Sequence, residues 1–261
     1  MYRYTYTECS VYSCNWSIPP TYIHTKINIT VCECSVIDNT MLSLYQSQLS
    51  EYTYILASAS PQRIHLIHTL LPELNNNITV SPSRFNEDLD QSQHTPYTYV
   101  INTSYCKCVD VYHQLNHTNT QFTPSHVIIS ADTIVVDQHS NIIEKSDNDE
   151  HAYNTLNQLQ GTTHHVITAV TLMKSNRSTT QPSVYNLINT NDSNSSTQST
   201  NILHNTSLHH LQPSNTTILQ FTVSTAVTFA SLTSDEIRAY VSTQQYRGKA
   251  GAYGIQGTAV C

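Results

Sequence analysis

The chain is poor in charged residues, in glycine and in long apolar runs. Only 11% of its 261 residues are charged, 5 are glycine, and Asp and Glu outnumber Lys and Arg by 18 to 11. The resulting net charge of -7 excludes the broad basic face of a protein that binds nucleic acid polymers, although a local cationic pocket for one nucleotide stays open. No apolar stretch approaches the roughly 20 residues that cross a bilayer, and residues 1–10 lack the apolar core of a signal peptide. We therefore expect a cytoplasmic protein with no membrane partner and no nucleic acid polymer as partner.

The cysteines form no recognisable metal or disulfide pattern. Their number, 7, is odd, and the close pairs lack the two-residue gap that is usual in zinc sites. We interpret them as free thiols. The alternative is a secreted protein with disulfide bonds, in which Asn-x-Ser/Thr triplets such as residues 28–30 and 205–207 would carry glycans.

The periodicity of apolar residues divides the chain into a short extension and one domain. Residues 1–40 show no sustained helical or strand period, which predicts a poorly ordered N-terminal extension before a domain at 41–261. Residues 174–220 are rich in Ser, Thr and Asn without a period, and we expect a disordered insertion there. Elsewhere strands alternate with helices, which predicts an α/β fold with a central mixed twisted sheet flanked by helices. The expected strands cover residues 54–57, 78–80, 126–137, 165–173 and 221–229, and the expected helices cover 63–74, 95–109, 147–160 and 233–241.

The most informative segment is residues 54–63, where an apolar run gives way to serine, proline and a helical pattern. We expect a strand, a tight turn and a helix that is capped by Ser60 and begins at Pro61. The exposed amides at such a helix start attract anions, and Arg63 adds a cationic fork that suits a phosphate. Taken alone, the segment also fits a capped helix with a surface arginine.

Asp132 is the strongest candidate for chemistry, because it interrupts the nearly continuous apolar residues of a predicted buried strand. A carboxylate in that setting must be paired, protonated or coordinated to a cation, although it can also cap a neighbouring turn. Glu87 offers a second carboxylate, and Lys107 and Lys145 offer cations. Acids that hold a divalent metal, together with bases that hold phosphates, are what phosphoanhydride hydrolysis requires.

Four of the 5 glycines lie between residues 248 and 257, beside Lys249. This concentration indicates either a tight structural loop or a backbone that approaches a ligand closely. His164 and His165 offer a metal pair, but adjacent residues of a strand point to opposite faces, which argues against one shared ion.

Four blocks of the sequence together resemble the Maf-like nucleoside triphosphate pyrophosphatases, also called septum-formation proteins. They are LASASPQR at residues 56–63, SADTIV at 130–135, LQGTTHHVITAV at 159–170 and KAGAYGIQG at 249–257. The resemblance implies the fold of the Maf and inosine triphosphate pyrophosphatases and hydrolysis of a nucleoside triphosphate to the monophosphate and pyrophosphate. It further implies a divalent cation, Mg or Mn, and a homodimer. The ending YGIQG resembles the branch that acts on dTTP and UTP.

The resemblance also implies a role for each matching residue. Asp132 would be the proton acceptor with Glu87 beside it, and both carboxylates would help to hold the metal. Lys107, Lys145 and Lys249 would contact the phosphates of the substrate, and Ser58, Ser60 and Arg63 would form an anion cradle. Gln62 would bind substrate at a position associated with substrate choice. Thr133 and Gln256 would bind the base and select it.

Three departures from the family pattern favour a second interpretation. Gln62 stands where the family usually has the first of two arginines, and Gly248 stands where it usually has an acid. The family also continues with a further glycine loop, a strand and a helix, whereas this chain stops at Cys261, which predicts a truncated C-terminus and an exposed sheet edge. The alternative to an active pyrophosphatase is therefore a catalytically weakened nucleotide-binding or regulatory module.

Overall fold

A computed structural model describes residues 27–28, 46–117, 123–175, 183–188, 213 and 215–254. Its helices are α2 (Gln46–Leu49), α3 (Pro61–Leu70), α4 (Pro96–His117), α5 (Asp149–Leu159) and α6 (Ser234–Ser242), with short 3-10 helices η1 (Pro72–Asn77) and η2 (Gln91–Gln93). Its strands are β1 (Ile27–Asn28), β2 (Thr53–Leu56), β3 (Ile78–Val80), β4 (His126–Val136), β5 (Ile142–Ile143), β6 (Thr163–Ser175), β7 (Ser183–Ile188) and β8 (Thr216–Phe229).

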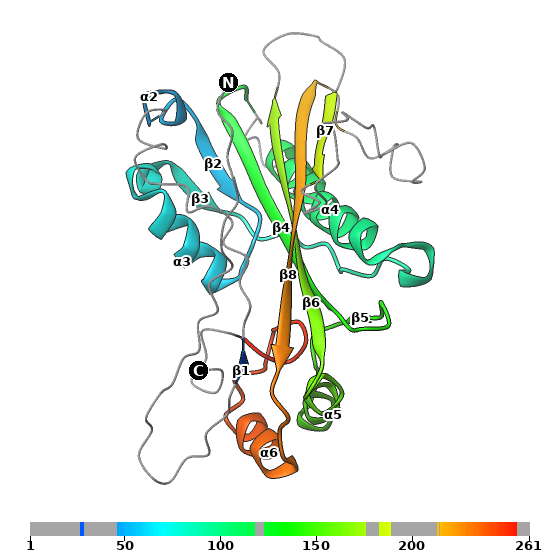
Figure 1. Cartoon of the computed structure of the whole chain (residues 1–261). Coiled ribbons are helices and arrows are strands. Elements are labelled where there is room, and N and C mark those ends of the chain that lie inside the picture. Colours follow the sequence, from blue (N-terminus) through cyan, green and yellow to red (C-terminus); the bar gives the residue numbers. More distant parts are fainter. Residues whose placement is uncertain are drawn as a thin grey trace, which may run out of the picture. The chain divides into compact units, whose positions relative to one another are not determined.

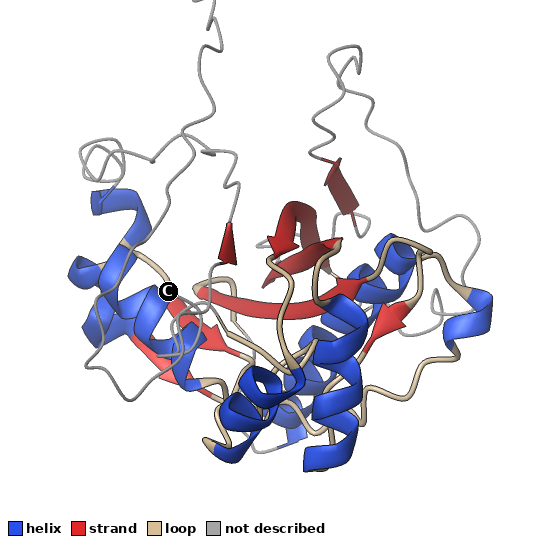
Figure 2. Cartoon of the chain, turned by 60° about the horizontal axis from the view of Figure 1, so that its bottom comes forward, coloured by secondary structure: helices blue, strands red, loops and turns tan. Residues whose placement is uncertain are grey.

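The strands form one mixed sheet of 8 strands (Figure 1). Its order is β1-β8-β6-β4-β2-β3, with β5 paired to β4 and β7 paired to β8. The pairs β2–β3, β2–β4 and β7–β8 are parallel, whereas β1–β8 and β4–β5 are antiparallel. Figure 2 shows the helices in blue among the red strands. The predicted α/β fold with a mixed sheet and flanking helices is confirmed.

The contacts between residues divide the chain into two compact units. Unit 1 takes its described residues from Met1–Val36, Thr133–Ile167 and Ser224–Cys261. Unit 2 takes its described residues from Ile37–Asp132 and Thr168–Val223. The ranges of β4, β6 and β8 cross this division, so each of these strands contributes residues to both units.

Unit 2 has its core between the long helix α4 and the sheet. Tyr105, Cys108 and Val111 of α4 are at most 1% exposed and belong to one apolar cluster with Ile55 of β2 and Ile128 of β4. Figure 1 shows α4 running behind the strands that it covers. Burial of these side chains removes apolar surface from water, which is the main stabilising contribution to such a core.

Unit 1 has its core between helices α5 and α6 and the ends of strands. Leu156 of α5, Ile237 of α6 and Phe229 of β8 lie in one cluster and are at most 3% exposed. The start of α6 is set by a capping box, in which Thr233 accepts from the Glu236 N–H and the Glu236 carboxylate accepts from the Thr233 N–H. This helix start was predicted from the same two residues.

Helix α3 differs from the prediction in its end and in its burial. It stops at Leu70 instead of continuing to residue 74, because the residue before Pro72 is disfavoured in helical conformation and η1 takes over the chain. The apolar residues of this helix at helical spacing predict one buried face, but the helix buries none of its residues, and Leu66 and Leu70 are 54% and 48% exposed.

The predicted disordered insertion at 174–220 contains strand residues. Strand β6 continues to Ser175, β7 occupies Ser183–Ile188 and pairs in parallel with β8, and β8 begins at Thr216 instead of residue 221. In β8 every second residue from Thr216 to Thr222 is buried, so the strand pattern begins earlier than its polar composition indicated. Three further stretches lie outside the described residues. They are residues 176–182, 189–212 and 214 of this insertion, residues 255–261, and the predicted extension apart from β1.

Cys106 and Cys108 are free and buried, as the interpretation of free thiols required, and the other cysteines lie outside the described residues. Burial raises the pKa of the Cys106 thiol to about 11 and that of the Cys108 thiol to about 12, so neither is a reactive thiolate near neutral pH. In the described part of the chain, no helix has both the length and the apolar character to cross a bilayer.

Candidate active site

The candidate site begins where neighbouring parallel strands end. Leu56, the last residue of β2, pairs with Val80 at the end of β3 and with Ile129 of β4. The segments that follow β2 and β3 therefore start beside the part of β4 that carries Asp132. Open α/β sheets bind ligands at the carboxyl ends of their parallel strands, where the following loops converge. All of these segments belong to unit 2.

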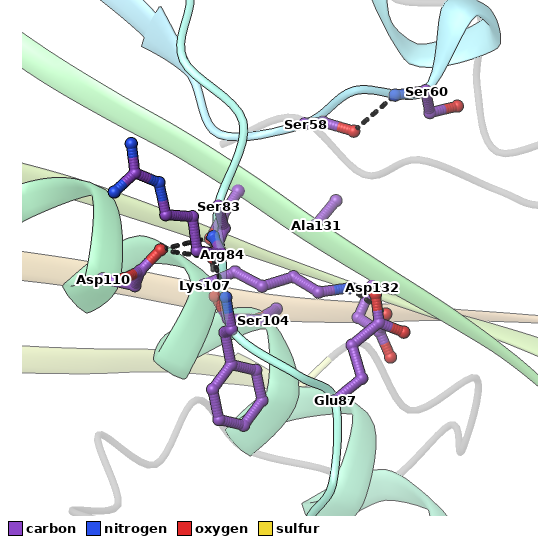
Figure 3. A network of polar contacts seen from close by, with 12 residues as sticks. Ser58, Ser60, Ser83, Arg84, Glu87, Ser104, Lys107, Asp110, Ala131 and Asp132 are labelled. Carbon is purple, nitrogen blue, oxygen red and sulfur yellow. Dashed lines mark hydrogen bonds and ion pairs between the residues drawn. The ribbon is translucent and has the colours of Figure 1, made fainter. Parts of the chain in front are cut away.

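The turn after β2 starts helix α3 as predicted. Ser60 caps the helix by accepting a hydrogen bond from the Arg63 N–H at 3.4 Å, and Pro61 lies in the first turn. The Ser60 N–H donates to the Ser58 hydroxyl at 3.2 Å, a contact drawn in Figure 3. The Ser60 hydroxyl donates to Gln62 Oε1 at 3.1 Å. The serines therefore order the turn, and Gln62 adds a polar group without a charge.

Arg63 is half-buried and tied to strand β4. Its guanidinium donates to the Ala131 carbonyl at 2.7 Å. Burial lowers the pKa of the Arg63 guanidinium, while the charges of Asp132 and Glu87 act in the opposite direction. Arg63 is therefore not a freely solvated arginine, and its part in phosphate binding stays a prediction.

Asp132, Lys107 and Glu87 form an ion-pair network of three side chains. Figure 3 shows Lys107 extending from α4 to the other two, with its Nζ 2.7 Å from Asp132 Oδ1 and 2.9 Å from Glu87 Oε1. The side chains of Lys107 and Asp132 are 9% and 7% exposed, whereas that of Glu87 is 35% exposed. A buried carboxylate needs such a partner, and Lys107 supplies it. The structure thus brings together three residues that the sequence analysis named as candidates.

The loop that carries Glu87 is held by Asp110, which the sequence analysis did not single out. Asp110 Oδ2 accepts from the Ser83 hydroxyl at 2.8 Å and from the Arg84 N–H at 2.7 Å (Figure 3). Glu87 itself has a φ of 57°, in the left-handed region that residues other than glycine seldom adopt. The sequence feature that could have identified Asp110 is its spacing of three residues from Lys107, which places both side chains on one face of α4.

Unit 1 carries the other described candidates, which are Thr133, Lys145 and Lys249. Thr133 lies on β4. Lys145 forms an antiparallel bridge with Ala250, so the segment of Lys145 runs beside that of Lys249. Gln256 lies outside the described residues, and its predicted part in base selection stays a prediction.

Glu87 and Asp132 are the carboxylates of unit 2 that could hold a hard divalent cation. Glu87 Oε1 and Asp132 Oδ1 both lie beside Lys107 Nζ, so the ammonium group occupies the point that the two oxygens share. Mg²⁺ typically uses one or two carboxylates and takes its other ligands from water and substrate phosphates. Within the described ranges, no group of three or more His, Cys, Asp and Glu side chains is arranged to hold a metal alone. A cation held by these two carboxylates would therefore take its other ligands from water and phosphate oxygens.

Comparison with known protein families shows to which family this chain belongs. The family model described as Maf-like protein matches residues 53–200 and 192–261. The chain belongs to the Maf-like family. The matched ranges contain all four blocks on which the resemblance was based, as well as the network of Asp132, Lys107 and Glu87.

Relatives of this Maf-like chain are named as nucleotide pyrophosphatases. The dTTP/UTP pyrophosphatase of Clostridium perfringens is 30% identical over 203 residues, which cover 78% of this chain and 80% of that protein. The nucleoside triphosphate pyrophosphatase of Dictyostelium discoideum is 32% identical over 212 residues, which cover 81% and 79%. A human protein named probable bifunctional dTTP/UTP pyrophosphatase/methyltransferase is 30% identical over 203 residues, which cover 77% of this chain and 26% of that protein. The predicted family and its dTTP/UTP pyrophosphatase branch are confirmed.

Proposed function

We propose that this Maf-like chain hydrolyses nucleoside triphosphates between the α and β phosphates, with dTTP, UTP or related modified nucleotides as substrates. The observation that supports this most strongly is the buried pair of Asp132 and Lys107 with Glu87 beside it. This network lies next to the ends of parallel strands, where open α/β sheets bind their ligands. The names of the relatives describe the same reaction class.

Asp132 is the proposed proton acceptor. It takes a proton from a water molecule as the water oxygen forms a bond to the α phosphorus. The bond between that phosphorus and the bridging oxygen to the β phosphate breaks, and its electron pair leaves with pyrophosphate. Lys107, 2.7 Å from Asp132 Oδ1, fixes the orientation of the carboxylate for this transfer.

A divalent cation, Mg²⁺ or Mn²⁺, is proposed beside Glu87 and Asp132. When bound, it supplies positive charge that neutralises the phosphate oxygens. Glu87 is well placed to bind this cation, because its side chain is 35% exposed and can reach a cation that enters with the nucleotide. Asp132, at 7% exposed, is sheltered from bulk water.

The phosphate contacts of unit 2 are proposed at the turn before α3. The hydroxyls of Ser58 and Ser60 and the guanidinium of Arg63 are ordered by the hydrogen bonds of this turn and of Ala131. An ordered set of donors binds an anion with little loss of side-chain freedom. The remaining proposed contacts, assigned from the resemblance to the family, are phosphate binding by Lys107, Lys145 and Lys249 and base selection by Gln62, Thr133 and Gln256.

The experiment that tests the proposal measures products from dTTP, UTP, CTP, their 5-methylated forms and 7-methyl-GTP with Mg²⁺ or Mn²⁺. We expect equimolar pyrophosphate and nucleoside monophosphate from dTTP or UTP. In ¹⁸O-labelled water the label should enter the monophosphate, because the water attacks the α phosphorus. Label in pyrophosphate, release of orthophosphate alone, or no turnover of any nucleotide would contradict the proposal.

Gln62 supports a second candidate function, a catalytically weakened nucleotide-binding or regulatory module. Its exposed side chain accepts a hydrogen bond from the Ser60 hydroxyl, and an amide cannot neutralise a phosphate as the usual arginine of the family would. This candidate predicts calorimetrically measurable binding of dTTP or UTP with negligible hydrolysis. Gln62→Arg should then increase turnover, and full turnover in the unaltered chain would reject this candidate.

A further inference from the structure

Unit 1 contains a buried polar pair that the proposed reaction does not use. His164 of β6 and Tyr253 are 0% and 7% exposed, and His164 Nε2 lies 2.7 Å from the Tyr253 hydroxyl oxygen. His165 is exposed, so the two histidines point to opposite faces of the strand, as predicted. His164 is therefore an internal group and not half of an exposed metal pair.

Aromatic packing holds this pair rigidly. The rings of His164, Phe229 and Tyr253 meet edge to face, with centroids 4.8 to 5.4 Å apart. Burial lowers the pKa of the His164 imidazole to about 4, so the ring is neutral near pH 7. Among the described residues, His164 Nδ1 has no hydrogen-bond partner, so the contact with Tyr253 is the polar contact that this ring makes.

Tyr253 directly follows a turn that begins at Lys249. The Ala252 N–H donates to the Lys249 carbonyl at 3.2 Å, which closes the turn. The Lys249 side chain then lies across Gly254, because a Cβ added at Gly254 would be 2.8 Å from Lys249 Cδ and 2.9 Å from its Cε and Nζ. The lysine side chain is thus in contact with the backbone immediately after Tyr253.

We infer that His164 and Tyr253 are positioning residues for Lys249, because they fix the backbone against which the lysine side chain lies. The inference rests on the proposed function, in which Lys249 contacts a phosphate. Without the anchor, the turn and the ammonium group would take up many positions. Binding of the triphosphate would then weaken more than the chemical step, so KM would rise while kcat changed less.

Two glycine substitutions distinguish the effect of displacing the Lys249 side chain from the effect of straining the backbone. Gly254→Ala sets a methyl group against the flexible end of Lys249, and we expect KM to rise about tenfold with a melting temperature within about 2 °C of the unaltered protein. Gly248→Ala is the matched control, because nothing lies within 4 Å of its added Cβ while its φ of +71° strains any other residue. It should lower the melting temperature and leave KM unchanged. An unchanged KM in Gly254→Ala, where Lys249→Met raises KM, would overturn the inference.

The hydrogen bond itself is tested by removing one partner and then both. Tyr253→Phe leaves the buried His164 without a partner, so the melting temperature should fall and KM should rise at least about threefold. The double variant His164→Leu/Tyr253→Phe replaces both polar groups by apolar ones, so the melting temperature should recover. We expect KM to stay raised in the double variant. Recovery of both quantities would show a purely structural role and would overturn the inference.

Hydrogen exchange gives a readout that needs no turnover. The Gly251 and Ala252 N–H groups donate to the carbonyls of Glu144 and Lys249, so their exchange rates report on the turn. We expect both to exchange at least about tenfold faster in the double variant than in the unaltered protein. Unchanged exchange would overturn the inference whether or not any nucleotide is hydrolysed. Faster exchange in a chain without turnover would support the anchor and contradict only the proposed function.

Discussion

Replacing Lys107 by methionine is expected to cost much of the stability of the fold. The Lys107 Nζ lies 2.7 Å from Asp132 Oδ1 and 2.9 Å from Glu87 Oε1, and its side chain is 9% exposed. Methionine is similar in length but carries no charge, so the buried carboxylate of Asp132 would lose its cationic partner. Removing one partner of a buried ion pair typically costs about 3–5 kcal/mol, and we expect a loss of this size in the free energy of unfolding.

Glu87→Gln is the matched comparison, because Glu87 is the most exposed of the three members of the network. Its side chain is 35% exposed, and its removal leaves the pair of Lys107 and Asp132 intact. An exposed ion pair contributes about 0–1 kcal/mol, so this variant should lose no more than that. The double variant Lys107→Met/Asp132→Asn leaves no unpaired buried charge and should recover part of the stability lost in Lys107→Met.

The assay is urea unfolding followed by circular dichroism, with the free energy of unfolding extrapolated to water. We expect the loss in Lys107→Met to be several times that in Glu87→Gln. Equal losses in the two variants, or a loss below about 1 kcal/mol in Lys107→Met, would refute the reasoning that burial of the pair sets its contribution.

Other parts of the fold give predictions that the same unfolding assay checks. Burial lowers the pKa of His164 from 6.5 to about 4, so below pH 6.5 the unfolded chain binds a proton that the folded chain does not. The stability contributed by neutral His164 is therefore fully present above pH 6.5. As the pH falls from 6.5 toward 4, the free energy of unfolding should decrease by up to about 3 kcal/mol. His164→Leu should make the free energy of unfolding less dependent on pH in this range. Gly251→Ala should lower the free energy of unfolding by about 3 kcal/mol or more, because the φ of Gly251 is +68° and the added Cβ would lie 2.7 Å from Val135 Cγ2. Gly248→Ala adds a Cβ that meets no neighbour and should lower it by about 1–2 kcal/mol. Thr233→Ala removes the capping box of α6 and should cost about 1 kcal/mol, and a loss of less than about 0.3 kcal/mol would contradict the capping argument.

Helix starts could be predicted from the sequence because a cap is a local contact. Ser60 before Pro61 and Thr233 three residues before Glu236 each bond to amides within one turn, so all the information lies in a few neighbouring residues. The burial of α3 could not be predicted in this way. Whether Leu70 is covered depends on segments that are distant in the chain, and in the structure it is 48% exposed.

The start of β8 shows where composition misleads. Its first residues are rich in threonine and were assigned to a disordered insertion, yet Gln220 is 2% exposed. The amide nitrogen of Gln220 donates to the Thr171 hydroxyl of β6 at 3.0 Å, so the buried Nε2 has a partner, while Oε1 has none among the described residues. A polar residue that finds its partner on another strand looks, in the sequence alone, like a residue of a loop.

The members of the candidate site could be predicted, and the resemblance already placed Glu87 beside Asp132. A carboxylate within an apolar strand requires a partner, which pointed to Asp132, but only the folded chain shows that Lys107 lies between the two carboxylates. The residues that were missed act over long separations, since Asp110 bonds to residues 26 and 27 positions away. His164 and Tyr253 are 89 positions apart, and no local pattern connects them.

Pyrophosphate release by the unaltered chain and by Asp132→Asn, measured side by side with dTTP and UTP and Mg²⁺, tests the central claim most directly. Asparagine keeps the shape of the side chain but cannot accept the proton, and circular dichroism would check that the variant is folded. We expect that the unaltered chain releases pyrophosphate and that kcat in Asp132→Asn falls at least about 100-fold while the nucleotide still binds. Equal kcat values in the two proteins would contradict it.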